Sequence, residues 1–157
     1  MNTFIRTASA RDLPQVQTLL GVCWHATYDR IYGSARVSAI TADWHSMASL
    51  KARLAKPYSE FIVAQAEDGL AGMAYAAQSD PGFVTLHQLY ILPSAQGQGL
   101  GAQMLAEIEA AFPDAGAVRL EVEAANEKAV RFYARCGFET ISRTENCGMD
   151  GSGIAAL

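Results

Sequence analysis

One segment decides the fold of this chain: Pro93-Ser94-Ala95-Gln96-Gly97-Gln98-Gly99-Leu100-Gly101-Ala102. It joins an apolar, strand-like run at 86–92 to an amphipathic helical pattern over roughly 99–112. Glycines let the backbone turn sharply and leave its N–H groups open to a ligand. The unpaired N–H groups and the dipole of the following helix point into the same space. The segment therefore predicts a binding site for an anion, most often a phosphate.

Other phosphate-binding patterns fit this segment less well. Gly97-x-Gly99-x-x-Ala102 matches a loose dinucleotide-binding fingerprint, and Glu121 or Glu123 follows at about the expected ~20 residues. That fingerprint belongs to the first strand–helix turn of a large doubly wound sheet, whereas only 55 residues follow Ala102 here. No Lys-Ser or Lys-Thr follows the glycines, so a nucleoside triphosphate loop is excluded. A nicotinamide-linked oxidoreductase stays as a distant alternative.

A second motif lies about 25 residues downstream, after a strand-like run at 117–122. It reads Asn126-Glu127-Lys128-Ala129-Val130-Arg131-Phe132-Tyr133-Ala134-Arg135-Cys136-Gly137-Phe138. Asn126 is a good helix N-cap, and Gly137 suits a left-handed stop after the last turn. The segment is therefore predicted to be a short, well-bounded helix.

The two segments together resemble the GNAT family of acetyl-CoA-dependent N-acetyltransferases. The family's Gln/Arg-x-x-Gly-x-Gly/Ala loop is matched by Gln96, Gly99 and Gly101. Its later Asn-x-x-Ala-x-x-Phe-Tyr-x-x-x-Gly-Phe segment is matched by Asn126, Ala129, Phe132, Tyr133, Gly137 and Phe138. Ile5-Arg6-x-Ala8 followed by Asp12 also looks like the family's first strand and helix start.

The resemblance implies an α/β fold, with a mixed β-sheet flanked by helices in a single domain over 1–157. The residue pattern agrees, because half of the residues are hydrophobic and helical and strand-like runs alternate. The family's last strand would fall at 154–157 and would be short or truncated. The other expected elements are strands at 3–7, 60–66, 70–78, 83–92, 117–122 and 138–143, and helices from Ser9-x-x-Asp12 onward, over 41–55, over 99–112 and from Asn126.

Composition limits the compartment and the partners. No run approaches the ~20 apolar residues that a membrane span needs, and the N-terminus has no signal-peptide layout, so we expect a cytoplasmic protein. The cysteines Cys23, Cys136 and Cys147 are odd in number and lack metal-binding spacing, which favours free thiols and no metal. A net charge of −4 argues against a nucleic-acid partner and mildly favours an amine-bearing acceptor. Homodimer formation stays open.

The resemblance further implies that a neutral amine attacks the thioester of acetyl-CoA. The backbone from Gly97 to Ala102 would bind the pyrophosphate, although a simple glycine-rich strand-to-helix turn is the alternative. The pantetheine arm would pair with the strand at Leu89 and Ile91 as an added strand does, and an N–H near Leu89 would meet the oxyanion. The full set of expected cofactor-binding residues is Leu89, Ile91, Gln96, Gly97, Gln98, Gly99, Leu100, Gly101, Ala102 and Asn126.

Two residues are the expected catalysts. Tyr133, at the family's Tyr position, would donate a proton to the departing thiolate, or it packs in the core. His87 falls where family members often place a Glu, and an imidazole titrates near neutrality, so it could accept the amine proton. A strand histidine that only hydrogen-bonds is the alternative, and Tyr90 is the next candidate. The missing Glu also leaves open a second function, a catalytically weak sensor that binds CoA or acyl-CoA.

The acceptor pocket is expected between the first two helices and the strand at 83–92. Trp24, Tyr28 and Tyr32 share one helical face, and Asp29 lies beside them, so Trp24, Tyr28 and Asp29 are the expected substrate-binding residues. The alternatives are an aromatic stripe that packs the core and a solvated carboxylate. The sequence leaves the acceptor open: a small amine, an amino acid, an antibiotic or a protein N-terminus.

Overall fold

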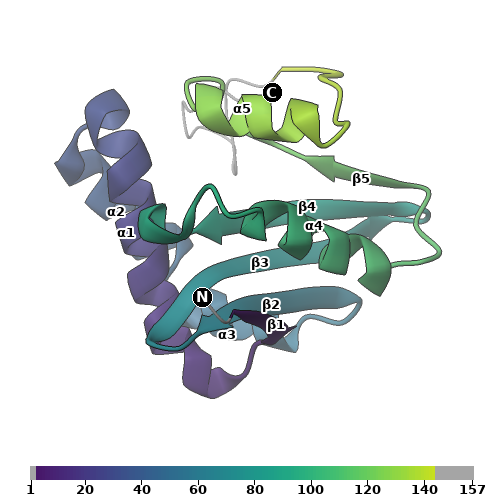
Figure 1. Cartoon of the computed structure of the whole chain (residues 1–157), viewed down its shortest axis with the longest axis horizontal. Helices are drawn as coiled ribbons and strands as arrows, with labels where there is room; N and C mark the ends of the chain where they lie inside the picture. Colours follow the sequence, from purple (N-terminus) through teal and green to yellow (C-terminus); the bar gives the residue numbers. More distant parts are fainter. Residues whose placement is uncertain (1–2, 144–157) are drawn as a thin grey trace. The chain divides into compact units, whose positions relative to one another are not determined.

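The computed structural model describes residues 3–143 (Figure 1). The chain divides into two compact units between Arg119 and Leu120. The described strands are β1 (Phe4–Thr7), β2 (Ser59–Ala66), β3 (Gly69–Asp80), β4 (Phe83–Ile91) and β5 (Ala117–Leu120). The described helices are α1 (Leu13–Tyr32), α2 (Ser34–Trp44), α3 (Met47–Ala55), α4 (Leu100–Ala111) and α5 (Glu127–Arg135), with 3-10 turns at Ala10–Asp12 and Pro93–Ala95.

The five strands form one sheet in the order β1-β2-β3-β4-β5. Strands β1 to β4 pair antiparallel with their neighbours along the chain. The N–H groups of Gly116 and Ala117 donate to Gly82 O at 2.7 and 3.3 Å, so β5 begins where β4 begins. A strand that returns through a crossover helix to start at the same end runs parallel to its neighbour. The predicted fold class, a mixed sheet flanked by helices, is therefore confirmed.

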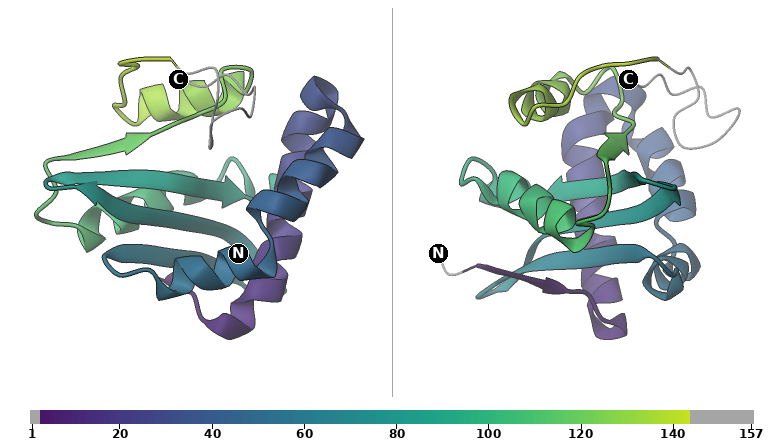
Figure 2. Two further views of the ribbon diagram at one scale, coloured as in Figure 1. Left: turned by 180° about the vertical axis from the view of Figure 1, so that it is seen from behind. Right: turned by 90° about the vertical axis from the view of Figure 1, so that its right-hand side faces the viewer.

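Helices cover both faces of this sheet (Figure 2). α1 and α3 cover one face, where buried side chains of α1 meet Phe61, Met73 and Tyr75 of the strands. α4 covers the other face and buries Leu100, Met104, Leu105 and Ile108, which recur at helical spacing. Gly72 permits this packing, because a Cβ there would lie 2.7 Å from Ile91 Cδ1 and 3.2 Å from Met104 Sδ.

The start of α1 is tied to β1 by a carboxylate. Arg6 Nη1 and Nη2 each lie 2.8 Å from an oxygen of Asp12, and the Ser9 N–H donates to the same carboxylate at 2.8 Å. The helix start predicted at Ser9-x-x-Asp12 is confirmed. The Arg6 hydrogen bonds are the main reason that the pKa of Asp12 falls to about 2.

Two predicted elements were wrong. The helical stretch expected at 41–55 is the end of α2, which begins at Ser34, followed by a separate helix, α3. The helical conformation is interrupted at His45 and Ser46, and Ser46 Oγ caps α3 by accepting from the Ser49 N–H at 3.1 Å. The strand expected near 138–143 does not form. A strand needs a hydrogen-bonded neighbour, which a local pattern cannot supply. The last strand expected at 154–157 lies outside the described residues, and the single domain over 1–157 stays a prediction.

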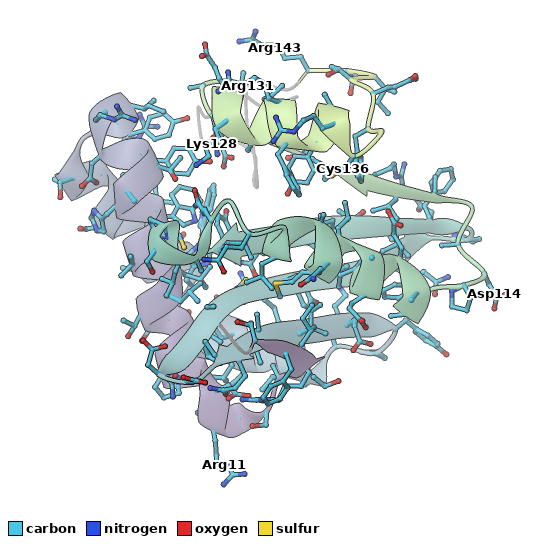
Figure 3. All side chains as sticks on the ribbon, in the orientation of Figure 1. Arg11, Asp114, Lys128, Arg131, Cys136 and Arg143 are labelled. Carbon is cyan, nitrogen blue, oxygen red and sulfur yellow. The ribbon has the colours of Figure 1, made fainter. Side chains whose placement is uncertain are left out.

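The second unit is organised around α5. Asn126 Oδ1 accepts from the Ala129 N–H at 3.2 Å, and Gly137 adopts a left-handed φ of 95° just after the helix. Both predicted caps are therefore confirmed. Cys136 lies at the C-terminal end of α5 (Figure 3).

The composition predicted free thiols, no metal site and no membrane span, and each can be compared with the described residues. Cys23 and Cys136 are free thiols, and Cys147 lies outside the described residues. Among residues 3–143, no group of three or more His, Cys, Asp or Glu side chains could hold a metal ion. None of the helices described is both long and apolar enough to cross a membrane.

Candidate active site

The loop between β4 and α4 has the geometry of an anion cradle. Gly97 and Gly99 take left-handed φ values of 82° and 78°, which side-chain-bearing residues rarely adopt. A Cβ at either position would meet nothing within 4 Å, so the space beside the backbone is open. Gly99 is the N-cap of α4, and the first N–H groups of a helix have no partner within it. Six of the predicted cofactor residues, Gly97 to Ala102, thus lie at one helix N-terminus.

A side chain of this loop, Gln96, and one of α1, Cys23, both reach the end of β4. Gln96 Nε2 donates to Ile91 O at 3.1 Å, and Cys23 Sγ lies 3.4 Å from the same oxygen. The Leu92 N–H donates to Ala71 O at 2.8 Å. Gln96 therefore shapes the loop, and the carbonyl of Ile91 is used within the protein. Contact of either residue with a cofactor stays a prediction.

The second half of β4 extends past its shorter neighbour. β5 has four residues and begins beside Gly82, so it runs alongside only the first part of β4. On its other edge β4 pairs with β3, where Leu89 is opposite Ala74 and Ile91 is opposite Gly72. The edge of β4 near Leu89 is thus suited to pairing with an extended ligand.

His87 lies on a bulge in β4. Tyr75 pairs with Gln88, and the next residue, Ala76, pairs with Leu86, so His87 is the extra residue. The bulge sends two consecutive side chains to the face covered by α1 and α3. The exposed His87 ring stacks on Tyr75 with centroids 5.6 Å apart, while Gln88 turns inward. The ring of Tyr90 reaches Trp24 of α1, with centroids 6.4 Å apart, on the same face.

The predicted acceptor residues lie between α1 and α2. Trp24 and Tyr28 are each 1 % exposed and pack with Val37. Both side chains therefore lie in the core, as the alternative of a core-packing aromatic stripe stated. Asp29 is not simply solvated, because its Oδ1 lies 2.7 Å from His25 Nδ1. His25 Nε2 in turn lies 3.4 Å from Ser38 Oγ of α2. The role of all three predicted residues in acceptor binding stays a prediction.

Sequence reasoning missed a buried polar pair beneath the bulge. His45, just after α2, and Gln88 of β4 are both buried, and Gln88 Nε2 lies 3.2 Å from His45 Nδ1. Burial, and then the nearby charge of Arg53, lowers the pKa of His45 to about 4. The ring is therefore neutral near pH 7. The break between two helical patterns marks His45 in the sequence, but nothing local links it to β4.

Tyr133 lies on α5 among aromatic side chains. Its ring centroid is 5.2 Å from that of Phe132 and 5.5 Å from that of Phe138. Burial, with smaller effects from Glu123 and Cys136, raises the pKa of Tyr133 far above its ordinary value. The phenol therefore keeps its proton and can donate it or a hydrogen bond. Asn126 caps the same helix, and its predicted contact with a cofactor stays a prediction.

Comparison with known proteins identifies the family. A family model described as an acetyltransferase (GNAT) domain matches residues 26–152. An uncharacterized N-acetyltransferase of Mycobacterium tuberculosis is 33% identical over 96 residues, 60% of this chain and 62% of that one. The N-alpha-acetyltransferase RimI of the same organism is 29% identical over 97 residues, 60% and 61% of the two chains. The chain thus covers less than two thirds of the length of these relatives.

Solved structures share the fold. PaiA N-acetyltransferase from Thermoplasma acidophilum, in complex with coenzyme A, has a TM-score of 0.83 at 23% identity and covers 99% of this chain and 98% of its own. The ribosomal-protein-S18-alanine N-acetyltransferase from Escherichia coli has a TM-score of 0.72 at 20% identity, covering 99% and 89%. GNAT acetyltransferases use acetyl-CoA. With most of its length matched by the family model, this chain belongs to the GNAT family of acetyltransferases.

Proposed function

We propose that this protein transfers the acetyl group of acetyl-CoA to a primary amine by direct attack. The observation that carries the proposal is the left-handed pair Gly97 and Gly99 at the N-terminus of α4, beside a β4 edge that β5 does not follow. The space beside both glycines is open, as a pyrophosphate approaching the backbone N–H groups requires. The solved complex of PaiA N-acetyltransferase with coenzyme A supports this choice of ligand.

Each step of the reaction has a candidate group. Loop N–H groups bind the pyrophosphate, and the Leu89 N–H donates to the carbonyl oxygen as it gains charge. The amine nitrogen bonds to the carbonyl carbon and the carbon–sulfur bond breaks. The thiolate takes a proton from Tyr133, whose raised pKa keeps the phenol protonated. The proton lost by the amine goes to His87, directly or through water, and Tyr90 is the next candidate.

The base assignment has its own test. If His87 accepts the proton, kcat/KM rises with pH through an ionisation near neutrality that His87→Ala removes. An acceptor with a low amine pKa keeps its own titration out of this range. A rise that persists unchanged in folded His87→Ala would show that His87 is not the base.

A second candidate function is a sensor that binds CoA or acyl-CoA with little catalysis. It is favoured by the composition of β4, whose residues Phe83–Ile91 include no carboxylate. One experiment separates the two functions: release of free thiol from acetyl-CoA over a panel of amines, with calorimetric titration of CoA in parallel. Turnover with any amine supports the enzyme, and CoA binding without turnover across the panel supports the sensor. Binding of NAD(H) but not CoA would contradict both.

We place the protein in the cytoplasm, where the free Cys23 and Cys136 stay reduced.

A further inference from the structure

A polar pair from distant parts of the chain lies beneath the β4 bulge. Gln88 Nε2 is 3.2 Å from His45 Nδ1, and the two residues are 6 % and 3 % exposed. An amide nitrogen only donates, so with Gln88 in this orientation Nδ1 accepts and the neutral ring carries its proton on Nε2. The pair connects the end of α2 to the strand residue that follows His87.

His45 is itself held from three helices. Its N–H donates to Thr41 O of α2 at 3.0 Å, and Gln17 Nε2 of α1 donates to its carbonyl at 3.2 Å. Arg53 of α3 donates to the carbonyl of the preceding residue, Trp44, at 2.7 Å. The backbone that carries the His45 ring is therefore fixed by the helical layer and not by the strand.

The His45–Gln88 pair stabilises the fold less than apolar side chains in the same space would. His45 Nε2 and Gln88 Oε1 are buried and have no hydrogen-bond partner among residues 3–143. An unsatisfied buried polar atom is destabilising, whereas two apolar side chains of similar volume would leave none. Stability alone therefore does not explain the pair. Buried polar groups can instead specify one packing arrangement over its alternatives.

The packing arrangement that this pair would specify is the bulge in β4. A bulge places one extra residue in a strand, and removing it shifts the register by one residue, which sends the side chains beyond it to the opposite face. Because Ala76 is opposite Leu86 and Tyr75 is opposite Gln88, His87 is the extra residue. Without an extra residue before it, Gln88 would pair with Ala74 and its side chain would point away from His45. The hydrogen bond thus selects one register of β4.

We propose that His45 and Gln88 are positioning residues that fix the β4 bulge and so aim His87 and the Leu89 N–H at the reacting thioester. The proposal rests on the acetyl transfer proposed above. His45 transfers no proton in this role. It acts through Gln88 on groups that touch the substrates.

The test removes the hydrogen bond from either side. Gln88→Met and His45→Leu each lower kcat about 10- to 100-fold, the scale of a misplaced catalytic group, and change the KM for acetyl-CoA less than kcat. The double variant is no worse than the poorer single variant, because both remove the same interaction. His45→Asn presents an acceptor oxygen near the place of Nδ1 and recovers most of kcat. Arg119→Gln, which breaks the exposed ion pair of Arg119 with Asp80 on the same sheet, leaves kcat unchanged.

Hydrogen exchange gives a readout that does not need turnover. The amides of His87 and Gln88 exchange faster in Gln88→Met than in the wild type and at the wild-type rate in Arg119→Gln. Wild-type kcat in folded Gln88→Met would overturn the proposal, as would a loss in His45→Asn equal to that in His45→Leu. If His45→Leu does not fold, Gln88→Met and His45→Asn carry the test. If the wild type itself shows no turnover, the proposed function fails, and unchanged exchange in Gln88→Met overturns the positioning role separately.

Discussion

Tyr133 combines a protonated phenol with a ring held by aromatic neighbours. Because Tyr133→Phe removes one hydroxyl and keeps the ring contacts with Phe132 and Phe138, the fold should survive. We expect kcat to fall about 10²-fold, the lower range for lost acid catalysis. The measurement is kcat at several pH values under conditions where chemistry limits turnover. Tyr58→Phe, at a tyrosine that is 78 % exposed, is the matched control. Wild-type kcat in Tyr133→Phe would reject the acid role.

Cys23 should be unreactive even though it is a free thiol. It is buried on α1, and burial raises its pKa to about 12, so almost no thiolate is present near pH 7. We expect native protein to leave Cys23 unlabelled by iodoacetamide, and unfolded protein to label it fully, as mapped by peptide mass spectrometry. Cys136, which is only partly buried, should label faster in the native state. Equal rates at the two cysteines would contradict this reading of the burial.

At the scale of single elements, a substitution in the loop between β4 and α4 tests whether that loop binds CoA. Gly99 has a φ of 78°, so Gly99→Ala strains the backbone by about 1–2 kcal/mol while its Cβ meets no neighbour. We expect calorimetry to show CoA affinity lowered at least about 10-fold, since relaxing that strain moves the N–H groups of the cradle. Gly82→Ala is a matched control, because Gly82 has a φ of 83° and equally open space but lies in the β3–β4 turn. Equal CoA affinity in the two folded variants would contradict the assignment of the cradle.

The elements that sequence predicted well are those whose causes are local. The glycine turn before α4, the Asn126 cap and the Asp12 helix start each depend on residues within a few positions of one another. The bulge at His87 and the partner of Gln88 could not be predicted in this way. The bulge exists only relative to β3, and His45 is 43 residues from Gln88 in the sequence. The surroundings of His87 and Gln88 were therefore less predictable than the glycine turn.

For the whole molecule, the fold is better determined than the acceptor. A TM-score of 0.83 at 23% identity shows that very different sequences share this arrangement of sheet and helices. What the comparison shows in common is the fold. The fold does not fix the acceptor, and the contact of Asp29 with His25 does not name one. Substrate class therefore has to be tested on this chain.

The stability of the whole molecule should fall in two steps as the pH is lowered. The pKa of His45 drops from 6.5 to about 4 on folding, so the unfolded chain binds more protons between these values and stability is lost as the pH falls from 6.5 to 4. The pKa of Asp12 drops from 3.8 to about 2, so its contribution is lost as the pH falls from 3.8 to 2. We expect up to about 3 kcal/mol from His45, and about 1–2 kcal/mol from Asp12 because its partner Arg6 is partly exposed.

Two substitutions separate these steps. His45→Asn cannot titrate and should flatten the dependence of the unfolding free energy on pH between 6.5 and 4, leaving the lower step in place. Asp12→Asn should do the reverse, and because the two residues share no contact, the double variant should lack both steps. Urea unfolding at half-unit pH intervals measures each curve, and the m-value shows whether the transition stays comparable. A wild-type curve that is flat from pH 6.5 to 4 would show that His45 is not buried as a neutral ring. An upper step that survives in His45→Asn would assign the titration to another group.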